Sequence, residues 1–419
     1  MKTVDVTVIG GGPAGLAAAI EAHKNGAKVL LVEREARLGG ILKQCIHDGF
    51  GLVRFGEKLT GPEYAHRFIK EFTDLKIEAL TLTFVTAVDR TSEGYALTLV
   101  NRNGMSKVLS KTLILATGCR ERTAKQVFIH GTRPAGVYTA GTAQNFVNLC
   151  GVMPAKRCVI LGSGDIGLIM ARRLTLEGAQ VLGVYEIQST PSGLTRNIHQ
   201  CLHDYGIPLH LSHTVTRVFG HNRMTAVEVA QVDENKAVIE STKQIIECDT
   251  LILSVGLIPE NEQAESLGIQ IDPFTKGPIC DQGLQTLLDG VFSCGNALHV
   301  NDLVDYVSES GETAGRNAAK WAHDSRTFAS IEPGNGIAYT VPQRLNTAEA
   351  GGNVVLYFRS KKVYEKALLQ VTVNDAPVYE KKYAHLKPPE MERLSIDFAQ
   401  YDIKTGDTVK VQIKEDAAK

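Results

Sequence analysis

Short apolar runs alternate with stretches of helical periodicity along residues 1–120 and again along residues 160–325. Apolar runs that are followed by helices are typical of strands buried in a parallel sheet. The runs that we expect to form such strands are Val4–Ile9, Lys28–Val32, Cys158–Leu161, Val181–Tyr185 and Thr250–Val255. The pattern predicts an α/β chain with two parallel-sheet units, and a helix over Ser308–His323 closes the second zone.

The pattern changes after this helix. Residues 328–336 contain a cluster of turn-forming residues and are expected to be a linker. Beyond it, short runs with strand character are separated by turn residues, without a helical pattern between them; these runs are Val354–Phe358, Leu368–Val373, Pro377–Tyr383, Leu394–Phe398 and Thr408–Ile413. We therefore expect a small antiparallel all-β domain over residues 337–419.

A glycine-rich loop of the form Gly-x-Gly-x-x-Gly, Gly10–Gly15, lies between the first strand and a helix expected over Ala14–Asn25. In dinucleotide-binding units the first glycine permits a tight turn, the second lets the backbone approach the pyrophosphate, and the third lets helix and strand pack closely. The helix N-terminus holds the phosphate charge. Glu33, at the end of the next strand, can accept the ribose hydroxyls. This order of elements predicts a dinucleotide site rather than a plain glycine turn.

A second loop of the same form, Gly162–Gly167, follows the strand Cys158–Leu161. The strand after its helix leads to Glu186, and a carboxylate there suits a free 2′-hydroxyl and repels a 2′-phosphate. NAD is therefore favoured over NADP, although Arg196 lies nearby in the sequence and keeps the NADP alternative open. Two such units in one chain indicate that one holds a flavin and the other delivers hydride to it.

On these motifs the chain resembles the pyridine nucleotide–disulfide oxidoreductase superfamily, the flavoproteins with two dinucleotide-binding domains. Leu113–Gly118 and Leu251–Gly256 resemble the two Ala-Thr-Gly segments of this family. Gly290–Asn296 resembles its late FAD motif, although Asn296 stands where the family usually has aspartate. The resemblance covers roughly residues 1–325.

The resemblance implies a domain arrangement and two sets of ligand residues. Two Rossmann-like domains are expected, with an NAD-binding domain at 123–272 inserted into a discontinuous FAD-binding domain at 1–122 and 273–326. FAD is expected to contact Gly10, Gly12, Pro13, Ala14, Gly15, Glu33, Arg34, Gly40, Gln44, Ala116, Thr117, Gly118, Gly295, Asn296 and Val304. NAD(H) is expected to contact Gly162, Gly164, Asp165, Ile166, Gly167, Glu186 and Gly256.

The resemblance also implies that the last helix of the FAD domain, opened by Asn301–Asp305, points its N-terminus at the flavin pyrimidine. The positive end of the helix dipole would stabilise negative charge on the reduced ring. Asp302 is expected to cap this helix, and Asp305 and Glu309 are expected to lie in solvent.

Relatives that reduce disulfides carry Cys-x-x-x-x-Cys soon after the ribose segment, or Cys-x-x-Cys before the second loop. Here the first stretch contains Cys45 alone, and Cys150 and Cys158 are eight residues apart. A dithiol reductase is therefore not expected. Cys45 and His47 remain candidate catalytic residues, with Cys45 as a peroxidase-type sulfenate whose pKa is depressed by Lys43 or His47. The alternative, which we favour, is a small buried thiol beside a wall histidine.

Further segments narrow the resemblance to the NADH/FAD oxidoreductase subunit of multi-subunit bacterial glycerol-3-phosphate dehydrogenase. These segments are Gly39–His47, Gly49–Leu52, Leu59–Tyr64, Ala116–Arg122, Arg133–Val137 and Asn301–Ser308. The resemblance implies two partners, a small Cys-x-x-Cys protein and a second flavoprotein, which is the dehydrogenase subunit. More distant relatives are subunits of amino-acid, opine and cyanide-forming dehydrogenases, which often carry an iron–sulfur module. This chain has no cysteine after Cys294, so any such relay is expected on a partner chain.

Composition adds few constraints. The net charge is -1, which does not favour a nucleic-acid partner, and no apolar run approaches the ~20 residues of a membrane span. Eight scattered cysteines and the lack of an export signal before the first strand predict a cytoplasmic protein with reduced thiols. No metal site is expected, because the histidines of the second unit are dispersed; an oligomer is expected.

The expected function is an FAD-dependent NAD(H) oxidoreductase that passes electrons between NADH and a partner flavoprotein or iron-containing protein, without a redox-active disulfide. Three alternatives remain open: a stand-alone NADH oxidase or peroxidase that uses Cys45, a dehydrogenase subunit for a small molecule such as an amine or amino acid, and a flavin-bearing scaffold without turnover. The β-domain is expected to be a docking or assembly module. The alternative is that it covers an apolar face of the FAD domain.

Overall fold

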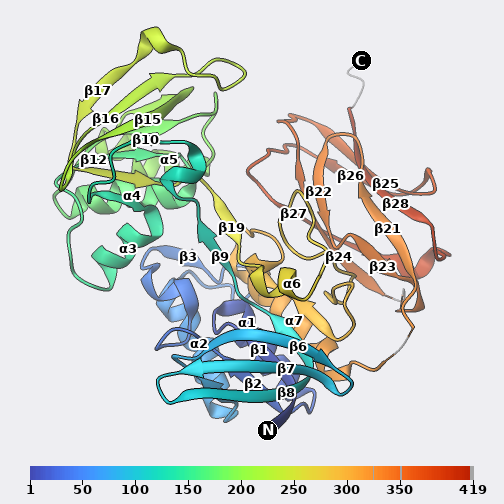
Figure 1. Ribbon diagram of the computed structural model, residues 1–419. Helices are drawn as coiled ribbons and strands as arrows, with labels where there is room; N and C mark the ends of the chain where they lie inside the picture. The colour runs from blue at the N-terminus through green and yellow to red at the C-terminus, as the bar shows by residue number, and fades with distance from the viewer. Residues whose placement is uncertain (324, 350–351, 416–419) are drawn as a thin grey trace. The chain divides into compact units, whose positions relative to one another are not determined.

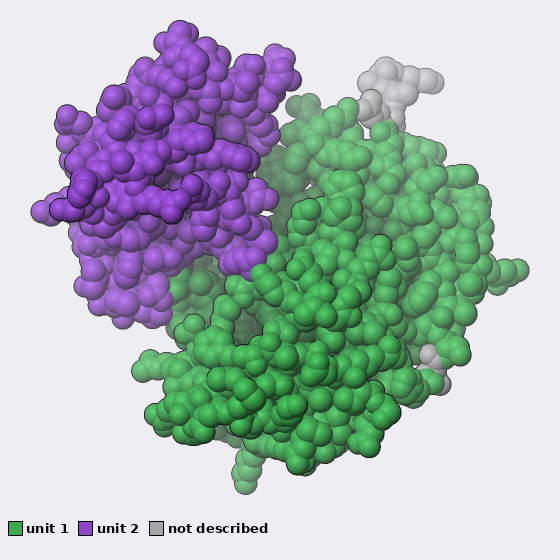
Figure 2. All heavy atoms as spheres, viewed as in Figure 1, with its two compact units in different colours: residues 1–119, 259–419 green, residues 120–258 purple. Residues whose placement is uncertain are grey.

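The computed structural model describes residues 1–323, 325–349 and 352–415. The chain divides into two compact units (Figure 2): unit 1 is Met1–Cys119 with Pro259–Lys419, and unit 2 is Arg120–Ile258. The expected α/β fold with two Rossmann-like units and a C-terminal β-rich region is confirmed.

Unit 2 ends before residue 272, the boundary expected from the sequence. The chain crosses between the units at β9 (Cys119–Glu121) and β19 (Leu257–Pro259), and the next segment packs in unit 1. There the Thr117 hydroxyl donates to the Glu260 carbonyl at 2.6 Å, and the Asn261 amide donates to the Ala297 carbonyl at 2.8 Å. Helix α6 (Glu262–Ser266) follows in the same unit.

Unit 1 begins with a sheet in the order β5-β2-β1-β8-β7-β6, in which β20 also pairs with β8 (Figure 1). Its parallel strands are β1 (Lys2–Ile9), β2 (Val29–Val32), β5 (Glu78–Leu80), β8 (Gly104–Leu115) and β20 (Val291–Ser293), and β6 (Phe84–Thr91) and β7 (Gly94–Asn101) extend the sheet antiparallel. Its helices are α1 (Pro13–Lys24), α2 (Gly61–Asp74) and α7 (Val304–Lys320), and β3 (Asp48–Phe50) and β4 (Leu59–Thr60) form a small ribbon. The first glycine loop therefore lies at the carboxyl end of β1, where open α/β sheets bind ligands.

Small residues bring α1 and α7 into close parallel contact. A Cβ atom at Gly311 would lie 2.2 Å from the Ala14 carbonyl oxygen, and one at Gly315 would lie 2.2 Å from that of Ala18. Because residues four apart recur on one helix face, this pairing fixes the register of the two helices. Both helices consequently begin at the same end of the sheet, and the N-terminus of α7 is placed relative to the first glycine loop.

Unit 2 also contains a parallel sheet with associated helices. Its parallel sheet has the order β11-β18-β12-β13-β14, formed by Val137–Thr139, Thr250–Leu253, Arg157–Leu161, Gln180–Glu186 and Leu209–Leu211. Its helices are α3 (Ala140–Asn148), α4 (Asp165–Leu176) and α5 (Thr195–Cys201). A second sheet has the order β10-β15-β16-β17, formed by His130–Gly131, His213–Gly220, Met224–Gln231 and Gln244–Glu247.

The β-domain, residues 328–415, begins earlier than expected, because β21 (Phe328–Pro333) occupies the predicted linker. One of its sheets has the order β23-β21-β28-β25-β26, formed by Arg344–Asn346, Phe328–Pro333, Thr408–Glu415, Ala367–Val373 and Ala376–Tyr383. The other sheet has the order β22-β24-β27, formed by Ile337–Val341, Asn353–Ser360 and Glu392–Asp397. Because β21 pairs with β28 in parallel, the domain is not purely antiparallel as expected. The sequence pattern did not indicate β21, because its alternating buried residues, Ala329 and Ile331, are followed by Pro333 and Gly334, which are typical of a turn.

The β-domain covers an apolar face of the Rossmann-like part of unit 1. Val341, Tyr357 and Met391 belong to the same buried cluster as Ala14 and Val307 of the Rossmann-like part. The interpretation that this domain covers an apolar surface therefore has direct structural support. In the described residues, no helix combines the length and the apolar character that a membrane crossing requires.

Candidate functional site

The first glycine loop leaves an open cradle at the start of α1. Gly12 is the N-cap of α1, and no side chain caps the helix. A Cβ atom at Gly12 would have only the Gly40 Cα within 4 Å, at 3.9 Å, whereas one at Gly15 would lie 1.8 Å from the Gly10 carbonyl oxygen. Gly15 is thus needed for packing, and Gly12 faces space. An uncapped helix N-terminus beside an open glycine suits the pyrophosphate of FAD.

Glu33 is buried at the end of β2 and is held by the backbone. Its Oε2 accepts from the Gly11 N–H at 2.6 Å, and its Oε1 accepts from the Glu35 N–H at 2.7 Å. A carboxylate has about four acceptor positions. Two are therefore left on Glu33 by the hydrogen bonds of the described residues, one for each hydroxyl of an adenosine ribose.

Other predicted FAD residues surround this cradle, but Arg34 has a different partner. The Arg34 guanidinium pairs with the Glu260 carboxylate at 2.9 Å. The carbonyl of Gly118 accepts from the Glu260 N–H at 2.9 Å, and Thr117 holds the same residue. Ala116 is buried at the end of β8, and its carbonyl oxygen lies 2.3 Å from where a Gly10 Cβ would be. We infer that Arg34, Thr117 and Gly118 organise the segment at Glu260.

The late motif lies beside the first turn of α1. A Cβ atom at Gly295 would lie 2.7 Å from the Ala14 Cβ, so the two loops are packed together. Asn296 Oδ1 accepts from the Asn301 N–H at 3.0 Å, and its Nδ2 donates to Cys119 Sγ at 3.5 Å. Asn296 therefore orders the loop that leads to α7.

The N-terminus of α7 differs from the expectation. Val304 begins the helix, its N-cap is Leu303, and no side chain caps it. The expected Asp302 cap is wrong, because Asp302 pairs with Arg359 of the β-domain. Asp305 and Glu309 are not in solvent as expected: Asp305 is buried, and Glu309 pairs with Arg393 at 2.6 Å.

The candidate catalytic segment does not activate its thiol. Cys45 Sγ donates to the Ile41 carbonyl at 3.4 Å, and burial raises the pKa of this thiol to about 12. This direction opposes the peroxidase-type alternative, which needs Lys43 or His47 to depress the pKa of Cys45, and is consistent with the favoured small buried thiol. Lys43 donates to the Arg37 carbonyl at 2.8 Å instead, and the His47 ring packs against that of Phe50. Gln44 is buried at the end of the same short helical segment, Gly40–Gln44.

The second glycine loop repeats the first with one difference at its carboxylate. Glu186 Oε2 accepts from the Ser163 N–H at 2.9 Å, and Oε1 accepts from the Gln188 N–H at 2.9 Å, as in the first unit. Oε2 also accepts from the hydroxyls of Ser163, at 2.6 Å, and Ser192, at 3.1 Å. Oε2 thereby accepts from three donors and Oε1 from one, so a ribose hydroxyl at Oε2 has to compete with the two serine hydroxyls, whereas Oε1 keeps one acceptor position.

The residues that follow Glu186 form a strap, residues 188–194, over the start of α4. Asp165 Oδ1 accepts from the Leu194 N–H at 2.9 Å and from Asn197 Nδ2 at 2.7 Å. A Cβ atom at Gly193 would lie 2.8 Å from the Ser163 carbonyl oxygen, so the strap lies tightly on the loop. The side chain of Asp165 thus positions the strap, which the sequence did not indicate.

The remaining predicted NAD residues keep the shape of the loop. Cβ atoms at Gly162 and Gly167 would lie 2.0 Å and 2.8 Å from Ser254 atoms, whereas Gly164 has only a 3.7 Å neighbour and faces space. Ile166 is partly exposed on α4, and Gly256 adopts a positive φ of 100°. The second loop therefore has the same open middle glycine as the first.

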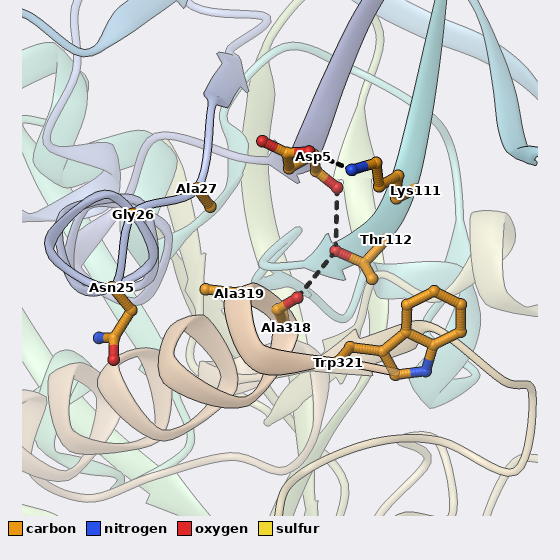
Figure 3. Close-up of a pocket in the computed structure, with 9 residues that line it drawn as sticks. All are labelled: Asp5, Asn25, Gly26, Ala27, Lys111, Thr112, Ala318, Ala319 and Trp321. Atoms are coloured by element: carbon orange, nitrogen blue, oxygen red, sulfur yellow. Dashed lines mark hydrogen bonds and ion pairs between the residues drawn. The ribbon is translucent and has the colours of Figure 1, made fainter. Parts of the chain in front are cut away.

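Other polar clusters do not form a competing site. His199 and His203 lie with their Nδ1 atoms 3.0 Å apart, and His210 stacks on Tyr185, but no metal-holding group of His, Cys, Asp or Glu occurs among the described residues. Figure 3 shows a pocket at the C-terminal ends of α1 and α7, away from the glycine loop. There Lys111 pairs with Asp5 at 2.7 Å, so its charges are satisfied internally.

Comparisons with known proteins agree with this geometry. A family model described as pyridine nucleotide-disulphide oxidoreductase matches residues 4–319. The chain is 28% identical over 292 residues to the HcnB subunit of hydrogen cyanide synthase from Pseudomonas protegens, covering 64% of this chain and 60% of that protein. It is 24% identical over 334 residues to a subunit of opine oxidase from Agrobacterium tumefaciens, covering 75% and 64%. The chain thus spans less than two thirds of the length of these relatives.

Two solved thioredoxin reductases share the fold. That of T. acidophilum has a TM-score of 0.61 at 19% identity and covers 76% of this chain and 99% of its own. That of Lactococcus lactis has a TM-score of 0.62 at 20% identity and covers 76% and 98%. The family match over most of the chain, with its two glycine loops and their buried carboxylates, shows that this protein belongs to the pyridine nucleotide–disulphide oxidoreductase family.

Proposed function

We propose that this chain is an FAD-dependent NAD(H) oxidoreductase that passes electrons between NADH and a partner flavoprotein or iron-containing protein. The observation that carries the proposal is the pair of matched glycine loops, each with an open middle glycine and a buried carboxylate. FAD, when bound at the first loop, supplies the hydride acceptor. The chain holds the pyrophosphate at α1, the ribose at Glu33 and the negative charge of the reduced ring at the N-terminus of α7.

Electrons leave the flavin without a dithiol in this proposal. Cys45 has no second cysteine at the required spacing, and its raised pKa keeps it as a thiol. Related proteins that are named as subunits of opine oxidase and of sarcosine oxidase support a subunit role. The finer proposal is a subunit of a glycerol-3-phosphate dehydrogenase complex, beside a second flavoprotein and a small Cys-x-x-Cys protein. It rests on the motifs from Gly39–His47 to Asn301–Ser308.

The proposal includes a cytoplasmic, oligomeric assembly, supported by the scattered cysteines and the subunit names of the relatives. Copurification of the native protein from its source, with the accompanying chains identified by mass, tests this part. A second flavoprotein together with a Cys-x-x-Cys protein is the expected result. An isolated chain that reduces its physiological acceptor alone would contradict it.

We expect NADH to reduce the flavin faster, and to bind more tightly, than NADPH. The buried Glu186 carboxylate accepts the 2′-hydroxyl of NADH and repels the 2′-phosphate of NADPH. Glu186→Ala should narrow the gap by about 1–3 kcal/mol, the value of a hydrogen bond to a charged group. Anaerobic stopped-flow spectroscopy of the flavin absorbance, at a time resolution on the order of milliseconds, measures both rates.

Ser192→Ala is the matched control for this experiment. It removes one of the two serine hydroxyls that compete with a ribose hydroxyl at Glu186 Oε2 and retains the carboxylate charge. We therefore expect tighter NADH binding with the preference for NADH preserved. Equal reduction rates for the two nucleotides in the parent protein would show that Glu186 does not select between them.

The stand-alone peroxidase that uses Cys45 is the second candidate function, and its thiol chemistry can be tested directly. Because burial raises the pKa of Cys45 to about 12, we expect this thiol to remain protonated at pH 7. Iodoacetamide at pH 7 should therefore alkylate the exposed Cys150 well before Cys45, as read by peptide mass spectrometry. Cys45→Ser should retain flavin reduction by NADH and activity with an artificial acceptor. Rapid alkylation of Cys45, with loss of peroxide turnover in the serine variant, would revive the peroxidase interpretation.

A further inference from the structure

Arg359 of β24 forms hydrogen bonds and an ion pair with the loop that leads into α7, at Val300 and Asp302. Its Nε donates to the Tyr339 hydroxyl at 2.9 Å, its Nη2 donates to the Val300 carbonyl at 3.4 Å, and its two Nη atoms pair with both oxygens of Asp302. Nη1 also donates to the Pro389 carbonyl. A guanidinium has five N–H donors in a fixed plane. This set of partners uses them fully and fixes the loop in one orientation.

The same loop is fixed by burial. His299 is buried, with its ring centroid 5.2 Å from that of Tyr357 and 6.5 Å from that of Tyr339. Burial and the nearby Arg359 lower the pKa of His299 to about 3, so the ring is neutral at ordinary pH. The loop therefore packs an uncharged aromatic group between two rings of the β-domain, while Arg359 holds its polar end.

Asp302 is kept away from the helix that it precedes. It lies one residue before the N-cap Leu303, and α7 has no side-chain cap. Aspartate is a favoured residue at helix N-termini, because its carboxylate accepts from free N–H groups and opposes the helix dipole. Here both of its oxygens are held by Arg359, and Oδ2 also accepts from the Met391 N–H at 2.5 Å. The only acidic side chain in the first turn of α7 among the described residues is therefore the buried Asp305, and the carboxylate of Asp302 is kept off the helix end.

We propose that Arg359 is a positioning residue of the flavin site, which holds Asp302 against the β-domain and so keeps a second carboxylate, in addition to Asp305, off the N-terminus of α7 that faces the proposed flavin. The inference rests on the proposed FAD site. It gives the β-domain a role in setting the redox properties of the cofactor, beyond covering an apolar surface. If Arg359 is lost, its charge disappears and Asp302 is free to turn to the helix. Both effects disfavour the extra negative charge of the reduced flavin.

The test is the midpoint potential of the bound flavin, measured in the full chain by equilibration with a reference dye under chemical reduction. Arg359→Met should make this potential more negative by at least a tenfold change in the reduction equilibrium, which is about 30 mV for two electrons. Arg359→Met/Asp302→Ala should return it toward the parent value, because the released carboxylate is gone. If Arg359→Met does not fold, Tyr339→Phe, which removes one acceptor of Arg359, should shift the potential in the same direction by less.

Arg326→Met is the matched control. Arg326 is exposed to a similar extent, with 12% of its side chain exposed against 16% for Arg359, but its hydrogen bonds go to Asp281, Thr286 and Leu287 and not to the loop before α7. It should lower the melting temperature without moving the potential. An unchanged potential in the Arg359 variants, or an equal shift in Arg326→Met, would overturn the inference. A parent protein that purifies without FAD would instead refute the proposed FAD site, so the two failures are distinguishable.

Discussion

Gly12→Val is expected to yield a folded but colourless protein. The backbone of Gly12 is extended, with φ −77° and ψ −173°, which valine adopts readily. No protein atom lies within 3.9 Å of its Cβ position, so the side chain enters the space proposed for the FAD pyrophosphate. We expect loss of nearly all bound FAD, read as the absorbance ratio at about 450 and 280 nm after purification, with an unchanged far-UV spectrum.

Gly164→Val is the matched variant in the second loop. Its backbone is also extended, with φ −64° and ψ 159°, and its nearest neighbour beyond the chain's adjacent residues is Ser254 Oγ at 3.7 Å. This protein should keep its flavin and lose reduction by NADH, while dithionite still bleaches it. The same substitution, glycine to valine, thus tests the first loop for FAD binding and the second loop for NADH binding.

Either of two outcomes would contradict this assignment. A Gly12→Val protein that purifies with a full flavin spectrum would show that the FAD site has been misplaced. A Gly164→Val protein reduced by NADH at the parent rate would show that the second loop does not bind the nucleotide. Gly15→Ala is not a useful probe, because its Cβ would lie 1.8 Å from the Gly10 carbonyl oxygen and would disturb the fold itself.

The two glycine loops were predictable because their constraints are local. Close packing of Gly10 and Gly15, and a carboxylate at the end of the next strand, leave a fixed spacing in the sequence. Spacings of 22 residues from Gly11 to Glu33 and of 23 from Ser163 to Glu186 placed the two carboxylates, and the structure shows both buried and held by their own loops. Parallel strands such as Val4–Ile9 were also predictable, since they are buried on both faces.

What the sequence could not indicate depends on pairing between distant segments. Arg359 and Asp302 are separated by 57 residues, and Arg393 and Glu309 by 84, with no motif that links them. The strap over the start of α4, residues 188–194, was not indicated either, because Asp165 holds Leu194 across 29 residues of sequence. The nearby Lys43 and His47 left a depressed pKa of Cys45 open as an alternative, because the sequence does not show the burial that raises this pKa.

The β-domain changes the expected result of a truncation. A cut after Gly336, suggested by the sequence, would leave β21 without its partner β28. A cut after His323 removes the whole β-domain and retains the pairing of Trp321 and His323 with Asp289. The docking interpretation expects such a protein to be soluble and yellow, and to lose only its partner chains.

We expect instead that the protein cut after His323 is insoluble or free of flavin. Val341, Tyr357 and Met391, with exposed fractions of 0%, 6% and 8%, cover the apolar core that contains Ala14 of the FAD loop. Full burial of each such side chain contributes about 1.5–3 kcal/mol, a large share of the about 5–15 kcal/mol by which domains are stable. The cut also leaves Asp302 and Glu309 without their arginine partners, which releases the start of α7.

The soluble fraction and the flavin content of the truncated protein measure this effect. Lys382→Glu, on the edge strand β26, is the control, because it alters the exposed rim of the β-domain without touching the covered face. This variant should remain soluble and yellow. A truncated protein that is yellow, is reduced by NADH and differs only in its copurifying chains would show that the domain serves docking alone. Because the covering residues and the arginines that hold α7 lie on the same face, we expect solubility and flavin binding to fail together.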